Sequence, residues 1–360
     1  MHRDDILVKL SEIMRDKDIN AILVTDRYNM RYLAGYRGEG VILYTESDRF
    51  VLTDSRYTEQ VQRECEGYEC VDIASLGYAG CIRDILERTY SGGKIRVGFE
   101  NYSISYMEYT KYSGAVSDAV WVALDGALDS LREVKTEEEI EKLKAAESIG
   151  DGAFKHILGF IKEGITEKEV ALELEYYMKC NGAEGLSFDT IAASGKNSSM
   201  PHAIPTDKKL ERGDFLTMDF GCLYEGYCSD MTRTVAIGDA TENMTYIYNT
   251  VLKAQTESMK KIRAGVRCDE VDAEARRVIG NAGYGNCFGH GLGHSVGLFI
   301  HENPRFSPKC HDILKPGMVI TVEPGIYLPG QFGVRIEDLV VVTENGYINL
   351  TESEKNLIII

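Results

Sequence analysis

Helical and strand-like hydrophobic patterns alternate along the first third of the chain. Apolar residues at positions 6, 7, 10, 13 and 14 follow the spacing of one helix face, and a β-branched run at 21–25 comes after a short polar break. Further runs are strand-like at 41–44, 50–53 and 95–99, and helix-like near 56–65 and 79–89. This alternation predicts a small α/β domain of about 130 residues.

Capping boxes mark the beginning of a second region. Thr136 is followed three residues later by Glu139 and then by a long helical pattern, and the same spacing recurs at Thr166 and Glu169. With 360 residues, two domains are expected. We place the boundary near residue 133, which gives domains at 1–132 and 133–360.

The hydrophobic pattern changes again beyond residue 186. Strand-like runs occur at 215–220, 319–322 and 339–342, with helical stretches near 242–263 and 270–282 between them. This order predicts an α+β fold with a largely antiparallel sheet for the second domain.

Composition and charge restrict the possible partners. A net charge of -17 without any cluster of Lys and Arg argues against nucleic acid. No apolar run reaches the roughly 20 residues of a membrane span, and the amphipathic N-terminus does not resemble a signal peptide, so we expect a cytoplasmic protein without a membrane partner. The nine cysteines include no Cys-x-x-Cys pair and predict reduced thiols.

Two aspartates occur in strand-like apolar surroundings. Asp219 is flanked by Met218 and Phe220, where burial of a lone carboxylate would be costly. Asp230 follows in a second strand-like run, so two antiparallel strands could bring both carboxylates to one cavity. For this pair alone a structural alternative stays open, in which Asp219 forms a salt bridge with Arg233 and Asp230 caps a turn.

A glycine-rich segment and two glutamates extend this acidic set. His290 and His294 lie among too many glycines for the helix of a His-Glu-x-x-His zinc site, but His294 can offer one imidazole ligand. Glu323 and Glu337 each lie in an apolar strand context, and four buried acids require cations to offset their charge. The mostly oxygen donor set favours Mn²⁺, Co²⁺ or Fe²⁺, and so many acids favour two ions.

These five residues and their surroundings resemble the pita-bread metallopeptidases. The matching phrases are Met-Asp-Phe-Gly, Ser-Asp-Met-Thr-Arg-Thr, Gly-His-Gly-Leu-Gly-His, Val-Glu-Pro-Gly-Ile-Tyr and Val-Arg-Ile-Glu-Asp. Within the family, the sequence is most similar to the proline-specific branch of aminopeptidase P and prolidase, and the phrase at 29–35 resembles its creatinase-like N-terminal domain. The resemblance implies a pita-bread catalytic domain at 133–360 after a smaller α/β creatinase-like domain at 1–132.

The resemblance also implies a role for each ligand. Asp230 and Glu337 would bridge two divalent ions, Asp219 would bind one ion, and His294 with Glu323 would bind the other. Mn²⁺ is the expected metal, with Co²⁺, Fe²⁺ and Zn²⁺ as alternatives. A water between two cations loses a proton near neutral pH, and Glu323 would accept that proton.

Other polar residues are assigned around this centre. The resemblance implies that His202 and His301 hydrogen-bond the substrate and stabilise the tetrahedral intermediate, while His290 supports the site indirectly. Each could instead be an ordinary surface or core histidine. Arg335 shares a strand face with Glu337 and could form an orienting salt bridge or contact the substrate. Arg305 could bind a substrate carboxylate or be a solvated loop residue.

The resemblance favours a metal-dependent exopeptidase that hydrolyses the bond between an N-terminal residue and proline. An Xaa-Pro dipeptidase (prolidase) needs a cation for the free carboxylate of its proline, and the single additional candidate, Arg305, could be a solvated loop residue. We therefore expect an Xaa-Pro aminopeptidase acting on proline-containing peptides. That dipeptidase is the alternative. A non-catalytic binding protein on the same fold is more distant, because all five ligands are present. The family also suggests a homodimer.

Overall fold

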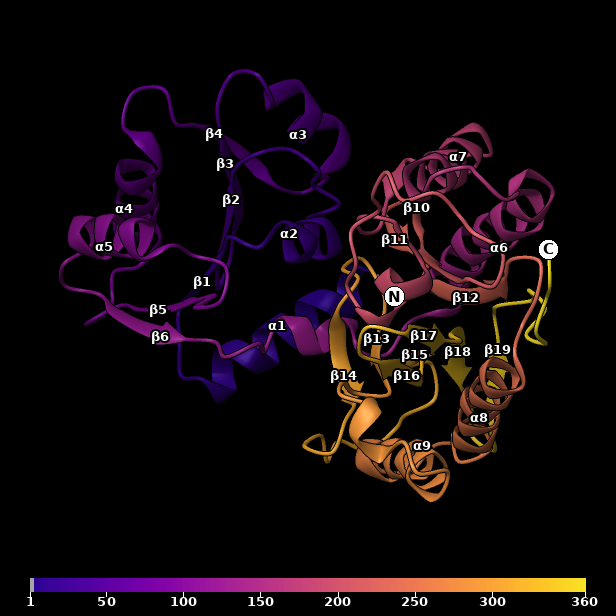
Figure 1. The fold of residues 1–360 in the computed structure, drawn as a ribbon. Helices are drawn as coiled ribbons and strands as arrows, with labels where there is room; N and C mark the ends of the chain where they lie inside the picture. Colours follow the sequence, from indigo (N-terminus) through magenta and orange to yellow (C-terminus); the bar gives the residue numbers. More distant parts are fainter. Residues whose placement is uncertain (1–2) are drawn as a thin grey trace. The chain divides into compact units, whose positions relative to one another are not determined.

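The hydrophobic runs of the N-terminal part form a six-stranded sheet (Figure 1). The computed structural model describes residues 3–360, and the chain divides into one unit that ends at Arg132 and another that comprises Glu133–Ile360. The sheet has the order β4-β3-β2-β1-β5-β6. Its strands are β1 (Ala21–Val24), β2 (Val41–Thr45), β3 (Arg49–Thr53), β4 (Glu69–Asp72), β5 (Arg96–Phe99) and β6 (Val120–Ala123).

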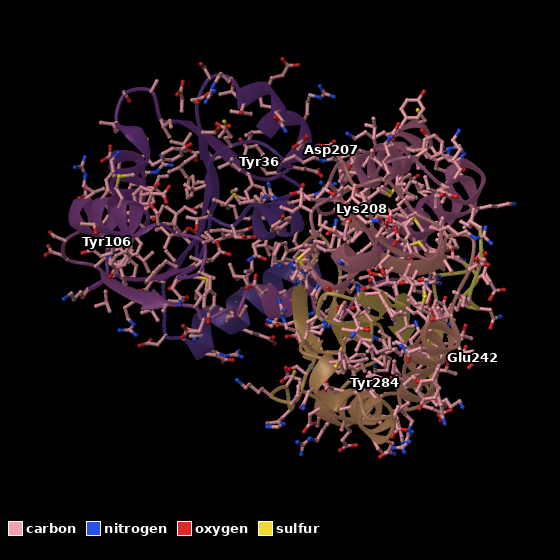
Figure 2. The ribbon with its side chains drawn as sticks, viewed as in Figure 1. Tyr36, Tyr106, Asp207, Lys208, Glu242 and Tyr284 are labelled. Carbon is pink, nitrogen blue, oxygen red and sulfur yellow. The ribbon has the colours of Figure 1, made fainter. Side chains whose placement is uncertain are left out.

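Helices cover both faces of this sheet because neighbouring strand residues point in opposite directions. Ile22 packs in a cluster with residues of α1 (Arg3–Asp16), α2 (Arg27–Ala34) and α3 (Thr58–Glu64). Leu23, the next residue, packs with residues of α4 (Gly77–Thr89) and α5 (Tyr106–Ala115). Figure 2 marks two tyrosines of this unit, Tyr36, which is buried, and Tyr106, which is exposed on α5. A 3-10 turn at Asp129–Arg132 ends the unit.

Two pairs of helices flank the strands of the second unit (Figure 1). One pair is α6 (Glu137–Phe160) and α7 (Glu167–Cys180), and the other is α8 (Glu242–Met259) and α9 (Cys268–Asn281). The predicted capping boxes at the beginning of α6 and α7 are confirmed. In each helix the threonine side chain accepts the backbone amide of the glutamate, and the glutamate side chain accepts the backbone amide of the threonine.

All strand pairs of the second unit are antiparallel. The larger sheets have the orders β12-β9-β8 and β14-β13-β15-β18-β19, and shorter ones have the orders β11-β10-β7 and β16-β17. The strands are β7 (Gly185–Leu186), β8 (Ile191–Ser194), β9 (Phe215–Phe220), β10 (Cys222–Tyr224), β11 (Tyr227–Cys228), β12 (Met231–Ala236), β13 (Gly293–Ser295), β14 (Glu302–Phe306), β15 (Val319–Val322), β16 (Gly325–Leu328), β17 (Phe332–Arg335), β18 (Asp338–Val342) and β19 (Tyr347–Asn349). The predicted α+β fold is confirmed.

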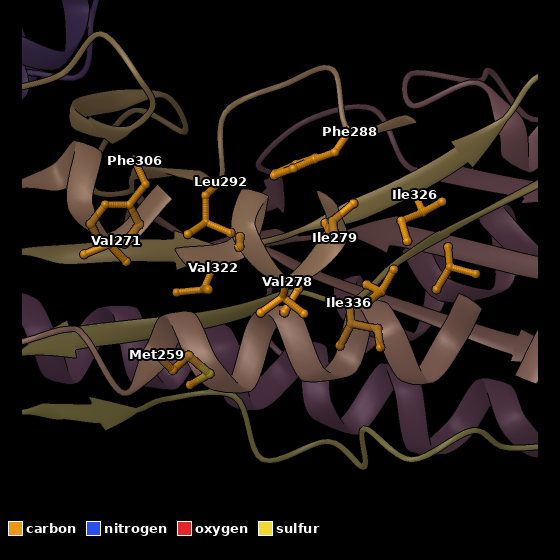
Figure 3. Packing of buried hydrophobic residues seen from close by; sticks show 14 of the residues in the cluster. Met259, Val271, Val278, Ile279, Phe288, Leu292, Phe306, Val322, Ile326 and Ile336 are labelled. Carbon is orange, nitrogen blue, oxygen red and sulfur yellow. The ribbon is translucent and has the colours of Figure 1, made fainter. Parts of the chain in front are cut away.

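Each large sheet packs on its own helix pair. Met218 and Leu216 of β9 lie in a cluster with residues of α6 and α7. Val322 of β15 lies in a second cluster with residues of α8 and α9, and Figure 3 shows Val278 and Ile279 there beside Ile336. Full burial of such side chains stabilises a fold by about 1.5–3 kcal/mol each. The second unit therefore has two apolar cores, one for each half.

Among residues 3–360, no helix combines the length and the apolar character needed to cross a bilayer.

Candidate metal centre

The first two predicted ligands come from one strand pair. Asp219 in β9 lies opposite Thr232 of β12, and Asp230 directly precedes β12. Both aspartates line the same cavity. The structural alternative for this pair is wrong, because Arg233 points to the other strand face and binds Asp338 at 2.8 Å.

The other three ligands come from the second half of the unit. His294 lies in β13, Glu323 follows β15, and Glu337 lies between β17 and β18. A Cβ at Gly293 would lie 2.0 Å from the Thr321 carbonyl oxygen, so only glycine permits this approach of β13 to β15. The amide of Glu337 donates to the Thr232 carbonyl at 3.1 Å and thereby joins the two halves beside the site.

The predicted ligands converge on one cavity of about 870 Å³. Donor atoms of Asp230, His294 and Glu337 all lie within 4.8 Å of one another. His294 Nε2 lies 3.5 Å from Asp230 Oδ2 and 3.5 Å from Glu323 Oε1. Asp219 lines the same cavity. The structure thus brings all five residues together.

His294 is held in a form that suits metal binding. Its Nδ1 lies 3.2 Å from the Ser295 carbonyl oxygen, so Nδ1–H donates there and the Nε2 lone pair faces the acids. Burial, and next electrostatic repulsion between protonated forms of His294 and His301, lower the pKa of His294 to about 3. A neutral imidazole with a fixed tautomer is the usual metal-ligating state of histidine.

The acids of the cavity are electrostatically unfavourable by themselves. Burial, followed by repulsion from neighbouring carboxylates, raises the pKa values of Asp230 and Glu337 well above their usual range. Burial also raises the pKa of Glu323 to about 8. Asp219 Oδ1 is buried and, among the described residues, has no hydrogen-bond partner. Divalent cations would offset the charge and occupy that oxygen, so the donor set fits a metal.

Arg335 is the cation that the protein itself supplies to this cluster. It forms a salt bridge with Asp219, and its Nε donates to Thr232 Oγ1 at 3.0 Å. Thr232 Oγ1 in turn donates to Glu337 Oε2 at 2.7 Å. Arg335 therefore orients one predicted ligand directly and a second through Thr232.

Tyr327 connects Arg335 to His290. Arg335 Nη1 donates to the Tyr327 hydroxyl at 2.8 Å, and that hydroxyl lies 3.0 Å from His290 Nε2. Burial, and next Arg335, lower the pKa of His290 to about 4, so the neutral ring accepts from Tyr327 and donates from Nδ1 to the Gly291 carbonyl. The sequence reasoning missed Tyr327, although the matching phrase Val-Glu-Pro-Gly-Ile-Tyr contains it.

Other supporting residues carried no signal in the sequence. Thr321 Oγ1 donates to Glu323 Oε1 at 3.3 Å and accepts from the His294 amide at 3.1 Å. Glu147 of α6 is fully buried and accepts the Asp230 amide at 3.2 Å. Nothing in the neighbouring residues of Thr321 or Glu147 distinguishes these contacts from ordinary packing.

His202, His301 and Arg305 also line the cavity. The ring of His301 lies 4.6 Å from that of His294, and burial, then Arg305 and His202, lower the pKa of His301. Arg305 in β14 lies directly opposite His294 in β13. Its guanidinium forms no hydrogen bond or ion pair with any residue that the structure describes.

Comparisons with known proteins agree with this fold and site. Residues 141–344 match metallopeptidase family M24, and residues 7–134 match the Creatinase/Prolidase N-terminal domain. The chain therefore belongs to metallopeptidase family M24, with a creatinase-type α/β domain before a pita-bread catalytic domain. Membership in this family implies divalent metal ions and peptide substrates.

Three relatives show how far the similarity extends. A structure named Xaa-Pro dipeptidase from Bacillus anthracis is 42% identical, with a TM-score of 0.95 over 100% of both chains. A curated Xaa-Pro dipeptidase of Pyrococcus furiosus is 38% identical over 98% of this chain and 99% of its own. A structure named X-Pro aminopeptidase from Thermotoga maritima is 38% identical, with a TM-score of 0.88 over 97% of this chain and 100% of that one.

Proposed function

We propose that this metallopeptidase is an Xaa-Pro dipeptidase, or prolidase, which hydrolyses the bond between an N-terminal residue and a C-terminal proline. The sequence alone favoured an aminopeptidase. Two observations reverse that preference. Relatives similar over nearly their whole length are named Xaa-Pro dipeptidase, and Arg305 provides a cation beside the predicted ligands.

The position of Arg305 carries the proposal. Residues directly opposite each other on antiparallel strands have Cα atoms about 4.5–5.5 Å apart, so the backbone of Arg305 lies close to that of His294. In a dipeptide, the terminal carboxylate follows the scissile carbonyl by one residue, or about 3.3–3.6 Å of chain. A guanidinium that lines the same cavity without a partner among the described residues suits a free carboxylate, which it can bind through two parallel hydrogen bonds.

The predicted ligands would hold two divalent ions, and the oxygen-rich donor set favours Mn²⁺. Bound ions would act as Lewis acids and lower the pKa of a bound water. Glu323, whose carboxylate lies beside His294, accepts the proton of the attacking water. His301 and His202 donate hydrogen bonds toward the scissile carbonyl oxygen, where negative charge develops. Arg335 holds Asp219 in position throughout.

Proline in the substrate has a direct consequence for recognition. An Xaa-Pro bond has no N–H to donate and exists as cis and trans isomers, so the site must accept a rigid ring in one isomer. Support for proline specificity comes from the names of the relatives and from the phrase resemblance. A homodimer stays a prediction from that resemblance.

The decisive experiment compares three substrate classes on purified, Mn²⁺-loaded protein. We expect kcat/KM for Xaa-Pro dipeptides to exceed that for Xaa-Pro-Xaa tripeptides by about tenfold or more, since loss of a charged hydrogen bond costs about 1.5–3 kcal/mol. Equal or faster cleavage of the tripeptides would instead support an Xaa-Pro aminopeptidase. One similar structure is named as such an enzyme. Equal cleavage of Xaa-Ala peptides would exclude proline specificity.

A further inference from the structure

A single loop forms one wall of the cavity. All residues from 201 to 205 line it, and they include His202. The loop leaves the sheet after Ser194, the last residue of β8, passes through a 3-10 turn at Gly195–Ser199, and reaches the first turn of α7 at Thr206, whose carbonyl accepts the Lys168 amide. Because the wall lies outside regular secondary structure, its position depends on contacts at the two ends of the loop.

One carboxylate binds both ends of this loop. Glu167 Oε1 accepts the backbone amide of Ser194 at 2.7 Å and the Ser194 hydroxyl at 2.9 Å. Glu167 Oε2 accepts the backbone amide of Thr206 at 3.0 Å and the Thr206 hydroxyl at 2.6 Å. Asn197 Nδ2 lies 3.0 Å from Oε1 and 3.1 Å from Oε2 and so bridges the two oxygens. Each oxygen thus holds one end of the loop.

The charge of Glu167 suits this arrangement. Its side chain is fully buried, and the groups that donate to it are amides and hydroxyls rather than cations. It occupies the first turn of α7, where the helix dipole favours a negative charge. A carboxylate has acceptors on both sides, whereas a glutamine would direct its NH₂ group at the donors of one end. Replacement by glutamine therefore removes the bonds of this side chain at one end of the loop and retains those at the other, while the backbone pairing of Ser194 with Leu216 and the Lys168 amide bond to the Thr206 carbonyl remain.

Further contacts fix the loop relative to the predicted ligands. The Ser198 hydroxyl accepts the Gly333 amide at 2.9 Å, and the Pro201 carbonyl accepts Arg335 Nη1 at 3.3 Å. Lys208, which is labelled in Figure 2, donates from Nζ to the Ser194 hydroxyl at 3.0 Å. The wall is therefore held between α7 and the strand that carries Arg335.

We infer that Glu167 is a positioning residue, which sets the cavity wall 201–205 and thereby places His202 against the substrate. Glu167 does not line the cavity and acts through the loop. The inference rests on the role of His202 in the proposed function. Misplacement of a reacting group by about 1 Å can cost about 10²-fold in rate, so weaker restraint of one loop end is expected to lower the rate strongly without any loss of metal.

The test uses Glu167→Gln and a matched control, Glu169→Gln, in the full-length protein. Glu169 lies on the same helical turn but is exposed and bonds only its capping partner Thr166, at 2.7 and 2.8 Å. Amide hydrogen exchange is measured on peptides that cover 194–206, together with bound metal. We expect faster exchange in these peptides for Glu167→Gln alone, with unchanged metal content.

Kinetics then connect the loop to His202. We expect kcat to fall about 10²-fold in Glu167→Gln, and expect this fall to disappear when His202 is already alanine, because the two residues act through one group. Unchanged exchange at 194–206 would overturn the inference. An equal fall of kcat in the His202→Ala background would also overturn it, as would wild-type kcat and KM despite faster exchange.

Two milder variants cover the case in which Glu167→Gln does not fold. Ser194→Ala and Thr206→Val each remove one hydroxyl donor to Glu167 and leave the backbone amide in place. Each should accelerate exchange at 194–206, and each should lower kcat only in protein that retains His202. Wild-type exchange in both variants would contradict the inference. If the wild-type protein cleaves no Xaa-Pro peptide, the proposed function fails, while the exchange comparison still decides whether Glu167 holds the loop.

Discussion

Arg335 Nη2 lies 2.7 Å from Asp219 Oδ2, and of the two side chains beside the acidic cavity that of Arg335 is buried and that of Asp219 is 14% exposed. This salt bridge occupies one oxygen of Asp219 and leaves Oδ1 as the buried oxygen without a hydrogen-bond partner among the described residues. Arg335 therefore decides which oxygen of Asp219 is available to a metal.

Arg335→Lys should lower kcat/KM about as much as Arg335→Met, by about 10²-fold. The guanidinium contacts Asp219, Thr232 and Tyr327 through different nitrogens, and an ammonium group cannot reproduce that planar arrangement. Steady-state kinetics of the two variants provide the measurement. A lysine variant within twofold of wild type would show that charge alone matters.

Asp230→Asn and Glu337→Gln should abolish turnover and reduce bound metal, because each carboxylate contributes to the shared donor group with His294. The fold should persist, since both changes remove a repelled negative charge. Metal analysis and circular dichroism check both points. Glu344→Gln, at an exposed position, is the control. Full activity of the wild-type protein without any divalent ion would exclude a metal mechanism.

His301→Ala and His202→Ala should each lower kcat by about 10²-fold, the usual scale for loss of a positioned proton donor or oxyanion partner. Metal content should stay at the wild-type value, because neither side chain belongs to the predicted ligand set. His311→Ala, which removes an exposed partner of Asp269, serves as control. Wild-type kcat in either cavity variant would mean that its catalytic assignment is wrong.

Arg305→Gln should raise KM for Xaa-Pro dipeptides by about tenfold or more, because the charged partner of the proline carboxylate is lost. The same variant should treat Xaa-Pro amides as the wild type does, since these substrates carry no carboxylate. Initial rates with matched dipeptides and amides separate the two. An equal rise of KM for both would place Arg305 elsewhere in the reaction.

The raised pKa of Glu100 should make the stability of the N-terminal unit depend on pH. Glu100 accepts the amides of Thr25 and Asp26, yet burial raises its pKa from 4.5 to about 7. The native state therefore binds the proton more tightly than the unfolded state, and this contribution to stability is lost as pH rises from about 4.5 through about 7.

The change should amount to on the order of 2–3 kcal/mol between pH 5 and pH 8, measured as the difference between wild type and Glu100→Gln. Urea titrations followed by tryptophan fluorescence can report it, because the single tryptophan, Trp121, lies in β6 of this unit. A difference that does not vary with pH would show that Glu100 is ionised across the whole range.

The ligand set was predictable because each acid occurs among apolar neighbours, as Asp219 does between Met218 and Phe220. Its partner was not predictable, because that choice depends on register. Thr232 lies opposite Asp219, so Arg233 points to the other face, and Arg335 arrives from a distant strand. Local sequence contains no information about such a pairing.

Glu167 shows the same limit more sharply. In Thr166-Glu167-Lys168-Glu169 it has the pattern of an exposed first helical turn, and residues distant in the sequence, Ser194, Asn197 and Thr206, surround its carboxylate. The helices α2 and α5 were not predicted either. Helix α5 buries only Tyr112 along its ten residues, so its sequence lacks an apolar stripe.

The predicted ligands are divided between the two cores of the second unit. Asp219 and Asp230 belong to the half that packs on α6 and α7, while His294 and Glu323 belong to the half that packs on α8 and α9. Ions held by both sets of residues would act as a cross-link, which by mass action would contribute about 2.7 kcal/mol at a free ion concentration 100 times Kd. The lifetime of this enzyme against cellular proteases would then follow the supply of its metal, and starvation for that ion would remove the protein as well as its activity.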